Sequence, residues 1–171
     1  MVEFLAHMLA ATPLWVYALF VFLLIRGIKS RQTATVTLER LALIPLIFFV
    51  WDLYDLVQYR HLTAGIVLVW LVVLAIGAGV GYWLIKPQRI RRVAEPRTIE
   101  RQPDYSALPI MMTAFAIKYV FGVLAAVSPA TMAKPGVSMA AVAVGGLFAG
   151  SFMGKFLRYI QCYRSATQEH N

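Results

Sequence analysis

The sequence predicts an all-α fold, an integral membrane bundle of five transmembrane helices that form a single polytopic domain over residues 1–171. Three observations support this fold class. Hydrophobic residues make up 60% of the chain and charged residues 14%, so too few polar side chains exist to cover a soluble fold. The apolar residues gather in five stretches of membrane-spanning length. The basic residues gather between these stretches.

The five predicted helices cover residues 8–28, 38–58, 63–85, 107–128 and 137–157. About 20 mostly apolar residues are needed for a helix to cross a bilayer, and each stretch has or approaches this length. Each is followed by a segment rich in charge, proline or glycine, such as GIKSRQTAT after the first and SPATMAKPG after the fourth. These breaks are typical of helix ends.

The first of these helices is predicted to stay in the mature protein. No basic residue precedes its long apolar run, and Arg26, Lys29 and Arg31 follow it. A cleaved signal peptide has the opposite order of charge and a shorter apolar run. We therefore count this helix as a membrane span.

The distribution of basic residues predicts the orientation, because Lys and Arg are retained in the cytoplasmic loops near helix ends. Nearly all of the 16 Lys and Arg residues belong to the first loop, the third loop or the C-terminal end. The opposite side has Arg60 and Lys134. We expect the N-terminus outside and the C-terminus inside, which requires an odd number of spans. The expected protein is therefore a multi-pass membrane protein.

The only long connection is the basic inner loop, residues 86–106, which contains three prolines and is predicted to be extended. Arg89, Arg91 and Arg92 lie within it. Basic residues at such an interface attract anionic lipid headgroups by about 1 kcal/mol each. These three arginines are therefore the predicted headgroup contacts, and the alternative is that they only determine the orientation.

Several function classes are excluded or disfavoured. The net charge of +8 does not indicate a nucleic-acid partner, because the basic residues flank apolar segments and form no amphipathic basic face. The single cysteine, Cys162, excludes an internal disulfide. His7 and His61 have no HExxH, CxxC or CxxCH spacing beside them, so we expect no metal and no cofactor. No GxSxG motif is present, and a membrane-bound enzyme ranks third among the function classes.

Ionisable residues interrupt the second and fourth apolar stretches. Asp52 and Asp55 are three residues apart and share one helix face. Lys118, followed by Tyr119, lies in the fourth helix within roughly 5 Å of the depth of Asp52. Since an ion inside the membrane costs roughly 2.5–3.5 kcal/mol, Lys118 needs a partner or water. We predict that Asp52 faces Lys118, with Asp55 at the mouth of an outward-facing polar cleft.

Two interpretations of these charges stay open. In the first, Asp52, Asp55, Lys118 and Tyr119 form an intramembrane polar site that binds or moves a small solute, proton or ion. In the second, the charges only maintain the helix register or extend to the interface. Ionisable residues within membranes are enriched at functional sites but are also found in structural roles.

Glycines at a spacing of four predict close helix packing. Gly146, Gly150 and Gly154 form a stripe in the fifth helix, and Gly77 and Gly81 form a shorter one in the third. Such stripes let a neighbouring helix approach until the backbones touch. The neighbour is another helix of this chain, a second copy or a membrane partner. The alternative function is therefore a non-catalytic scaffold or accessory subunit that packs through this stripe.

HMLAATPLWVYALF near the start, MMTAFAIKYVFGVLAAVSP in the fourth helix and GLFAGSFMGKFLR in the fifth resemble a family of small, uncharacterised bacterial inner-membrane proteins. Members of that family open with a His and a Thr-Pro-x-Trp-Val run and carry a Lys-Tyr pair in a later helix. The matching residues are His7, Thr12, Pro13, Trp15, Lys118 and Tyr119. The resemblance covers most of the chain, and none of its motifs is tied to a known activity. It implies that the protein lies in the bacterial inner (cytoplasmic) membrane.

Asp52 and Asp55 depart from this family pattern, in which small or hydroxylated residues are usual at these positions. The resemblance therefore leaves other partners open for Lys118, namely a backbone carbonyl, a hydroxyl or a bound anion.

Overall fold

The structure is a computed structural model, and it describes residues 13–59, 63–85, 90–92 and 97–168. Its long helices are α2 (Leu14–Lys29), α3 (Leu38–Tyr59), α4 (Ala64–Leu84), α5 (Ala107–Val127) and α7 (Pro135–Gln168), and the short α6 (Pro129–Met132) precedes α7. These long helices coincide with the five predicted stretches, and the all-α class is confirmed. The predicted start of the first helix, at residue 8, lies outside the described residues.

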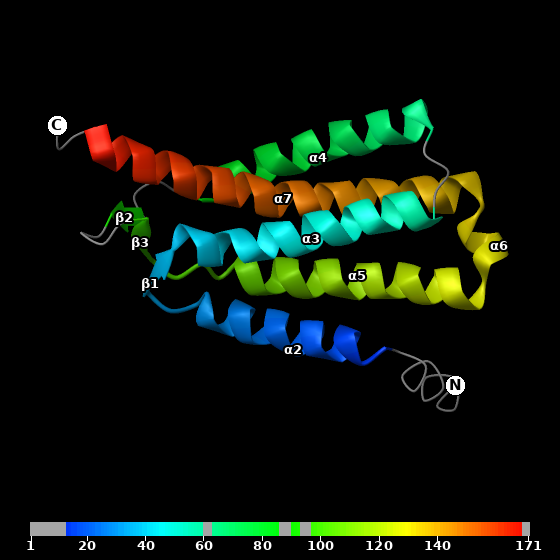
Figure 1. Cartoon of the computed structure of the whole chain (residues 1–171), viewed down its shortest axis with the longest axis horizontal. Helices are drawn as coiled ribbons and strands as arrows, with labels where there is room; N and C mark the ends of the chain where they lie inside the picture. Colours follow the sequence, from blue (N-terminus) through cyan, green and yellow to red (C-terminus); the bar gives the residue numbers. More distant parts are fainter. Residues whose placement is uncertain (1–12, 60–62, 86–89, 93–96, 169–171) are drawn as a thin grey trace.

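The long helices lie side by side along the long axis of the molecule (Figure 1). α7 packs against α4 on one side and α3 on the other, and α2 packs against α5. Leu14, at the start of α2, and Gln168, at the end of α7, lie at opposite ends of the bundle. The chain therefore traverses the bundle lengthwise an odd number of times.

A small antiparallel sheet closes one end of the bundle (Figure 1). Its strands β1 (Ala34–Thr37), β2 (Ile90–Arg92) and β3 (Thr98–Arg101) have the order β1-β3-β2, and Ile99 of β3 pairs with Val36 on one side and Arg92 on the other. The extended conformation predicted for the basic inner loop is found in β2 and β3. The pairing of β3 with β1 was not predicted, because it joins segments far apart in the sequence. Ile99 is fully buried beneath Tyr159 and anchors the sheet to the helices.

α7 is longer than the predicted fifth helix, which ended at residue 157. No glycine or proline interrupts residues 158–168, so nothing local stops the helix where the apolar run ends. Its extension carries Tyr159 and Tyr163 onto the residues around Ile99. The extra turns thus support the sheet.

The core is shared by four of the described helices. Leu23 of α2, Phe48 of α3 and Ala114 of α5 are fully buried, and Phe152 of α7 stacks on Phe48 with ring centroids 4.5 Å apart. This cluster binds α2, α3, α5 and α7 into one bundle. α4 has no residue in this cluster. It packs mainly against α7, and its Trp70 also packs against Leu56 and Phe49 of α3.

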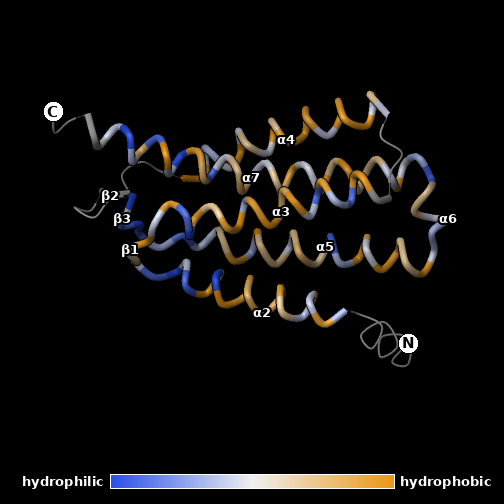
Figure 2. The backbone as a smooth tube through the Cα atoms, viewed as in Figure 1, coloured by the Kyte–Doolittle hydropathy of each residue, from blue (hydrophilic) through white to orange (hydrophobic). Residues whose placement is uncertain are grey.

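Large apolar side chains are also exposed on the outside of the helices. Hydrophobic residues recur along all the long helices (Figure 2). Along α4, Leu68, Val72, Ile76 and Val80 are all at least half exposed. A water-soluble protein rarely exposes such a continuous apolar surface. Among the described helices, three are long and apolar enough to cross a membrane, at Ala64–Leu84, Ala107–Val127 and Pro135–Ser165. These features are those of a membrane protein.

The two glycine stripes face each other between α4 and α7. A Cβ on Gly81 would collide with the carbonyl oxygen of Ser151, and one on Gly150 would collide with that of Leu74. Gly154 has the same relation to Ala78. The neighbour of the α7 stripe is therefore α4 of the same chain.

Candidate functional site

Lys118 of α5 lies between the two aspartates of α3. Its Nζ is 2.5 Å from Oδ1 of Asp52 and 2.8 Å from Oδ2 of Asp55. The side chains of Lys118 and Asp52 are 7% and 5% exposed, and that of Asp55 is 27% exposed. The three-residue spacing on α3 turns both carboxylates toward α5. We call Asp52, Asp55 and Lys118 the ionic triad.

Other helices complete the surroundings of Asp52 and Lys118. Trp70 of α4 donates a hydrogen bond from Nε1 to Oδ2 of Asp52, so each of these carboxylate oxygens has a donor. Gly145 of α7 leaves the space that Asp52 fills, because a Cβ there would collide with Oδ1. The Lys118 ammonium also lies 5.7 Å from the centre of the Trp51 ring, within the range of a cation–π interaction. α3, α4, α5 and α7 thus meet at one buried charge cluster.

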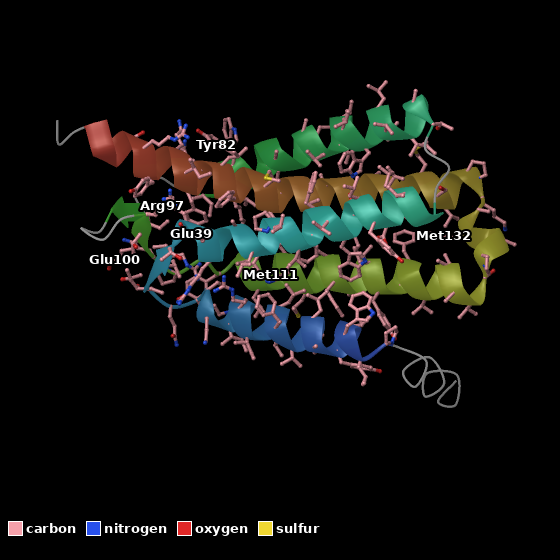
Figure 3. The ribbon with its side chains drawn as sticks, viewed as in Figure 1. Glu39, Tyr82, Arg97, Glu100, Met111 and Met132 are labelled. Atoms are coloured by element: carbon pink, nitrogen blue, oxygen red, sulfur yellow. The ribbon has the colours of Figure 1, made fainter. Side chains whose placement is uncertain are left out.

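The ionic triad adjoins two spaces. A small cavity of about 30 Å³ is lined by the triad together with Trp70, Met132 and Gly145, and it is large enough to hold a water molecule. Met132 is labelled in Figure 3, near the end of the bundle opposite the sheet.

The second space is a wide groove of about 1190 Å³ between α2, α3 and α5. Asp55 and Lys118 line both the groove and the small cavity. The remaining groove lining is mainly apolar and aromatic, with Trp15, Trp51 and Tyr54 among its residues. The sequence predicted a polar cleft at this place, whereas Asp55 and Lys118 are the only charged residues in the lining of the groove.

Tyr119 also lines the groove, where its ring stacks on that of Phe115 with centroids 6.3 Å apart. The structure therefore brings all four predicted polar-site residues to one place. Sequence reasoning missed Trp70, Trp51 and Gly145. Their only signal is their residue type within an apolar stretch, and this does not show which helix they face.

A second buried ion pair lies closer to the sheet. Lys155 of α7, predicted only as a flanking basic residue, has Nζ 3.0 Å from Oδ2 of Asp104 and 2.8 Å from Oγ of Ser106. Burial works against ionisation of Asp104, yet Lys155 and the hydrogen bonds from Ser106 hold the pKa of that carboxyl below its ordinary value. The pair joins α7 to the segment that precedes α5.

The structure describes only some of the other residues that were singled out from the sequence. Arg89, His7, Thr12 and His61 lie outside the described residues, and Arg91 and Arg92 form part of β2. Within the described part of the chain, no three His, Cys, Asp or Glu side chains gather as metal ligands would.

Comparison with known families matches residues 2–168 to DUF6622, a family of unknown function. Neither a curated protein nor a solved structure matches the chain. The family match confirms the expected relation to an uncharacterised family over nearly the whole chain. The bacterial origin and the His and Lys-Tyr motifs of that family stay predictions.

Proposed function

The chain belongs to DUF6622, a family of unknown function, and on this premise we propose that it is a multi-pass protein of the bacterial inner membrane that binds a small solute at the ionic triad. The proposal includes five membrane spans, with the N-terminus outside and the C-terminus inside. It rests on one observation above all. Asp55 and Lys118, partners in a partly buried ion pair, line a groove that opens between three helices.

The membrane assignment has three supports. Three described helices have the length and apolarity of spans. α2 and α3 run alongside them through the same bundle (Figure 1). Hydrophilic residues gather at the sheet end, where the basic connections lie (Figure 2), as the positive-inside rule requires for a cytoplasmic face.

The charge of the triad favours a cationic solute. With its three groups ionised, two carboxylates surround one ammonium, which leaves one formal negative charge in the site. A proton or a small cation would complement this negative charge. The aromatic lining of Trp15, Trp51 and Tyr54 favours a larger organic cation, because ring faces attract cations and also accept apolar groups.

The proposal is tested with tetraphenylphosphonium, a lipophilic organic cation, by equilibrium dialysis against the protein in an uncharged detergent. Wild-type protein is expected to bind the probe. Asp55→Asn preserves the shape of the side chain and removes its charge. It is expected to weaken binding about tenfold or more, as the loss of a charged interaction does.

Glu39→Gln is the matched control, since it removes one negative charge at the sheet end, where Glu39 pairs with Arg97 (Figure 3). This variant is expected to bind the probe as the wild type does. Absence of binding to the wild type, or equal affinity of wild type and Asp55→Asn, would overturn the proposal.

The scaffold alternative depends on a glycine stripe that is open to a partner helix. α4 occupies this stripe, with the carbonyl groups of Leu74 and Ala78 directly against Gly150 and Gly154. The surface on which the scaffold reading was based is thus covered within the chain. Solute binding is therefore the function that the geometry favours.

A further inference from the structure

A second pocket, separate from the ionic triad, lies at the sheet end of the bundle. It has a volume of about 230 Å³ and is enclosed by the end of α2, the start of α3, β1, the segment before α5, and α7. Its charged lining residues are Arg26, Lys29, Arg40, Arg101, Asp104 and Lys155. With all of these groups ionised, five cations face one carboxylate.

That carboxylate already has its partners. Asp104 accepts a hydrogen bond from Lys155 and two from Ser106. The Arg26 guanidinium donates to the backbone carbonyl of Arg40, a neutral acceptor that does not balance its charge. Arg26, Lys29, Arg40 and Arg101 therefore gather without a second carboxylate in the lining of the pocket.

Glu39 does not supply the missing negative charge, although it is adjacent to Arg40 in the sequence. It pairs with Arg97 at 3.4 Å, and both side chains are more than half exposed. Arg97 does not line the pocket. Figure 3 shows Glu39 and Arg97 at the sheet end of the bundle.

Arg101 is the clearest indication of an absent acceptor. The residue is only 9% exposed, and its side chain lines the pocket. It hydrogen-bonds Tyr159, yet its Nε has no acceptor among the described residues. A buried donor of a charged group without a partner is destabilising, and native structures rarely retain one without a reason.

We propose that this pocket binds a phosphate group, carried either by an anionic lipid headgroup or by free phosphate. Phosphate carries more than one negative charge and several acceptor oxygens, which suits an excess of cations. Guanidinium groups present N–H donors in a planar fork that matches phosphate oxygens. In this proposal the buried Arg101 and the half-buried Arg26 donate to the phosphate, while the exposed Lys29 and Arg40 contribute charge at the rim. The site is distinct from the predicted headgroup contacts at Arg89, Arg91 and Arg92.

The experiment measures the Tm of the protein in an uncharged detergent with two probes. The first is inorganic phosphate, compared with chloride at equal ionic strength. The second is dihexanoyl phosphatidic acid, compared with dihexanoyl phosphatidylcholine. Stabilisation by both probes identifies a site open to free phosphate, and stabilisation by phosphatidic acid alone identifies a lipid site.

Three variants locate the effect. Arg101→Gln is expected to weaken the affinity for the stabilising probe about tenfold or more, since it removes a charged donor. Arg40→Gln, at the exposed rim, is expected to weaken this affinity less. It is the variant to use if Arg101→Gln does not fold. Arg31→Gln removes the same charge from an exposed residue outside the pocket and is expected to leave the affinity unchanged.

Two results would overturn the proposal. In the first, neither probe raises the Tm of the wild type above its matched reference. In the second, Arg40→Gln and every folded Arg101→Gln sample respond to the probe as Arg31→Gln does. That second result would mean that the stabilisation comes from general charge screening rather than from the pocket.

Discussion

Lys118 forms ion pairs with two carboxylates that belong to one face of α3. Without the ammonium, Asp52 and Asp55 would be like charges side by side in an interior with little water. Breaking a buried ion pair by removing one partner is far more destabilising than the pair itself is stabilising, because the remaining charge is left uncompensated. Single substitutions in the ionic triad should therefore have large effects.

Lys118→Met is predicted to lower the free energy of unfolding by about 3–5 kcal/mol, the usual range for an orphaned buried charge. Lys134→Met is the control, because Lys134 is exposed in the link before α7, and exposed substitutions change stability by about 0.5 kcal/mol or less. Thermal unfolding in detergent measures both. Equal melting of Lys118→Met and wild type would show that the ion pairs contribute no stability.

The lowered pKa of Asp104 predicts that the stability of the protein depends on pH. This pKa lies below the ordinary value of 3.8 because Lys155 and Ser106 outweigh the effect of burial. A carboxyl with a lowered folded pKa contributes stability above its unfolded pKa and loses it as pH falls through the folded pKa. The wild type should therefore lose stability below about pH 4, the unfolded pKa of an aspartate. Asp104→Asn should lack this part of the loss. Parallel pH profiles of Tm for the two proteins would contradict the assignment.

Among the elements, α7 organises the bundle. One face carries the glycine stripe against α4, Gly145 accommodates Asp52 of α3, and Lys155 binds the segment before α5. α4 has only this helix as its main support in the described structure. Its attachment should therefore be sensitive to side-chain volume on α7.

Gly150→Leu is predicted to destabilise the protein by at least about 1–3 kcal/mol, the usual cost of overpacking, because backbone atoms of α4 leave no room for a side chain. Gly79→Leu is the matched control on α4, since nothing lies within 4 Å of a Cβ there. Thermal unfolding of the two variants measures the difference. Similar Tm values would mean that the two helices are not in backbone contact.

The described structure has the sheet of β1, β2 and β3 at one end of the bundle and α6, in the link between α5 and α7, at the other (Figure 1). In the proposed orientation, this arrangement places residue 33 inside and residue 133 outside. The hydrophilic sheet end would then face the cytoplasm (Figure 2).

Labelling of single cysteines tests this topology in a Cys162→Ser background. A membrane-impermeant maleimide should label Ala133→Cys in intact cells and should label Thr33→Cys only after the inner membrane is permeabilised. Both positions are at or next to residues that the structure exposes. Labelling of both from the same side, or recovery of the protein without detergent after ultracentrifugation, would contradict the proposed arrangement.

The sequence anticipated the helices more completely than the site. Each of the five apolar stretches forms a helix in its described part, since an apolar run of this length favours a helix over a strand, even with Pro45 inside α3. The pairing of β1 with β3 was beyond reach, because its strands are more than 60 residues apart. The site was predicted from the sequence only as a set of ionisable residues within apolar stretches. Trp70 and Gly145 could not be assigned to the site from the sequence, because the sequence of a single helix does not determine which of its sides faces the neighbouring helices.

By itself, the sequence determined which segments are helical and that the basic residues gather between them, because hydropathy and charge are properties of each stretch alone. Only the tertiary structure decided which groups meet. It placed Lys118 against carboxylates more than 60 residues away, α4 on the glycines of α7, and Arg101 in a pocket of other cations. Those contacts depend on the order and rotation of the helices, and these are set by packing across the whole bundle.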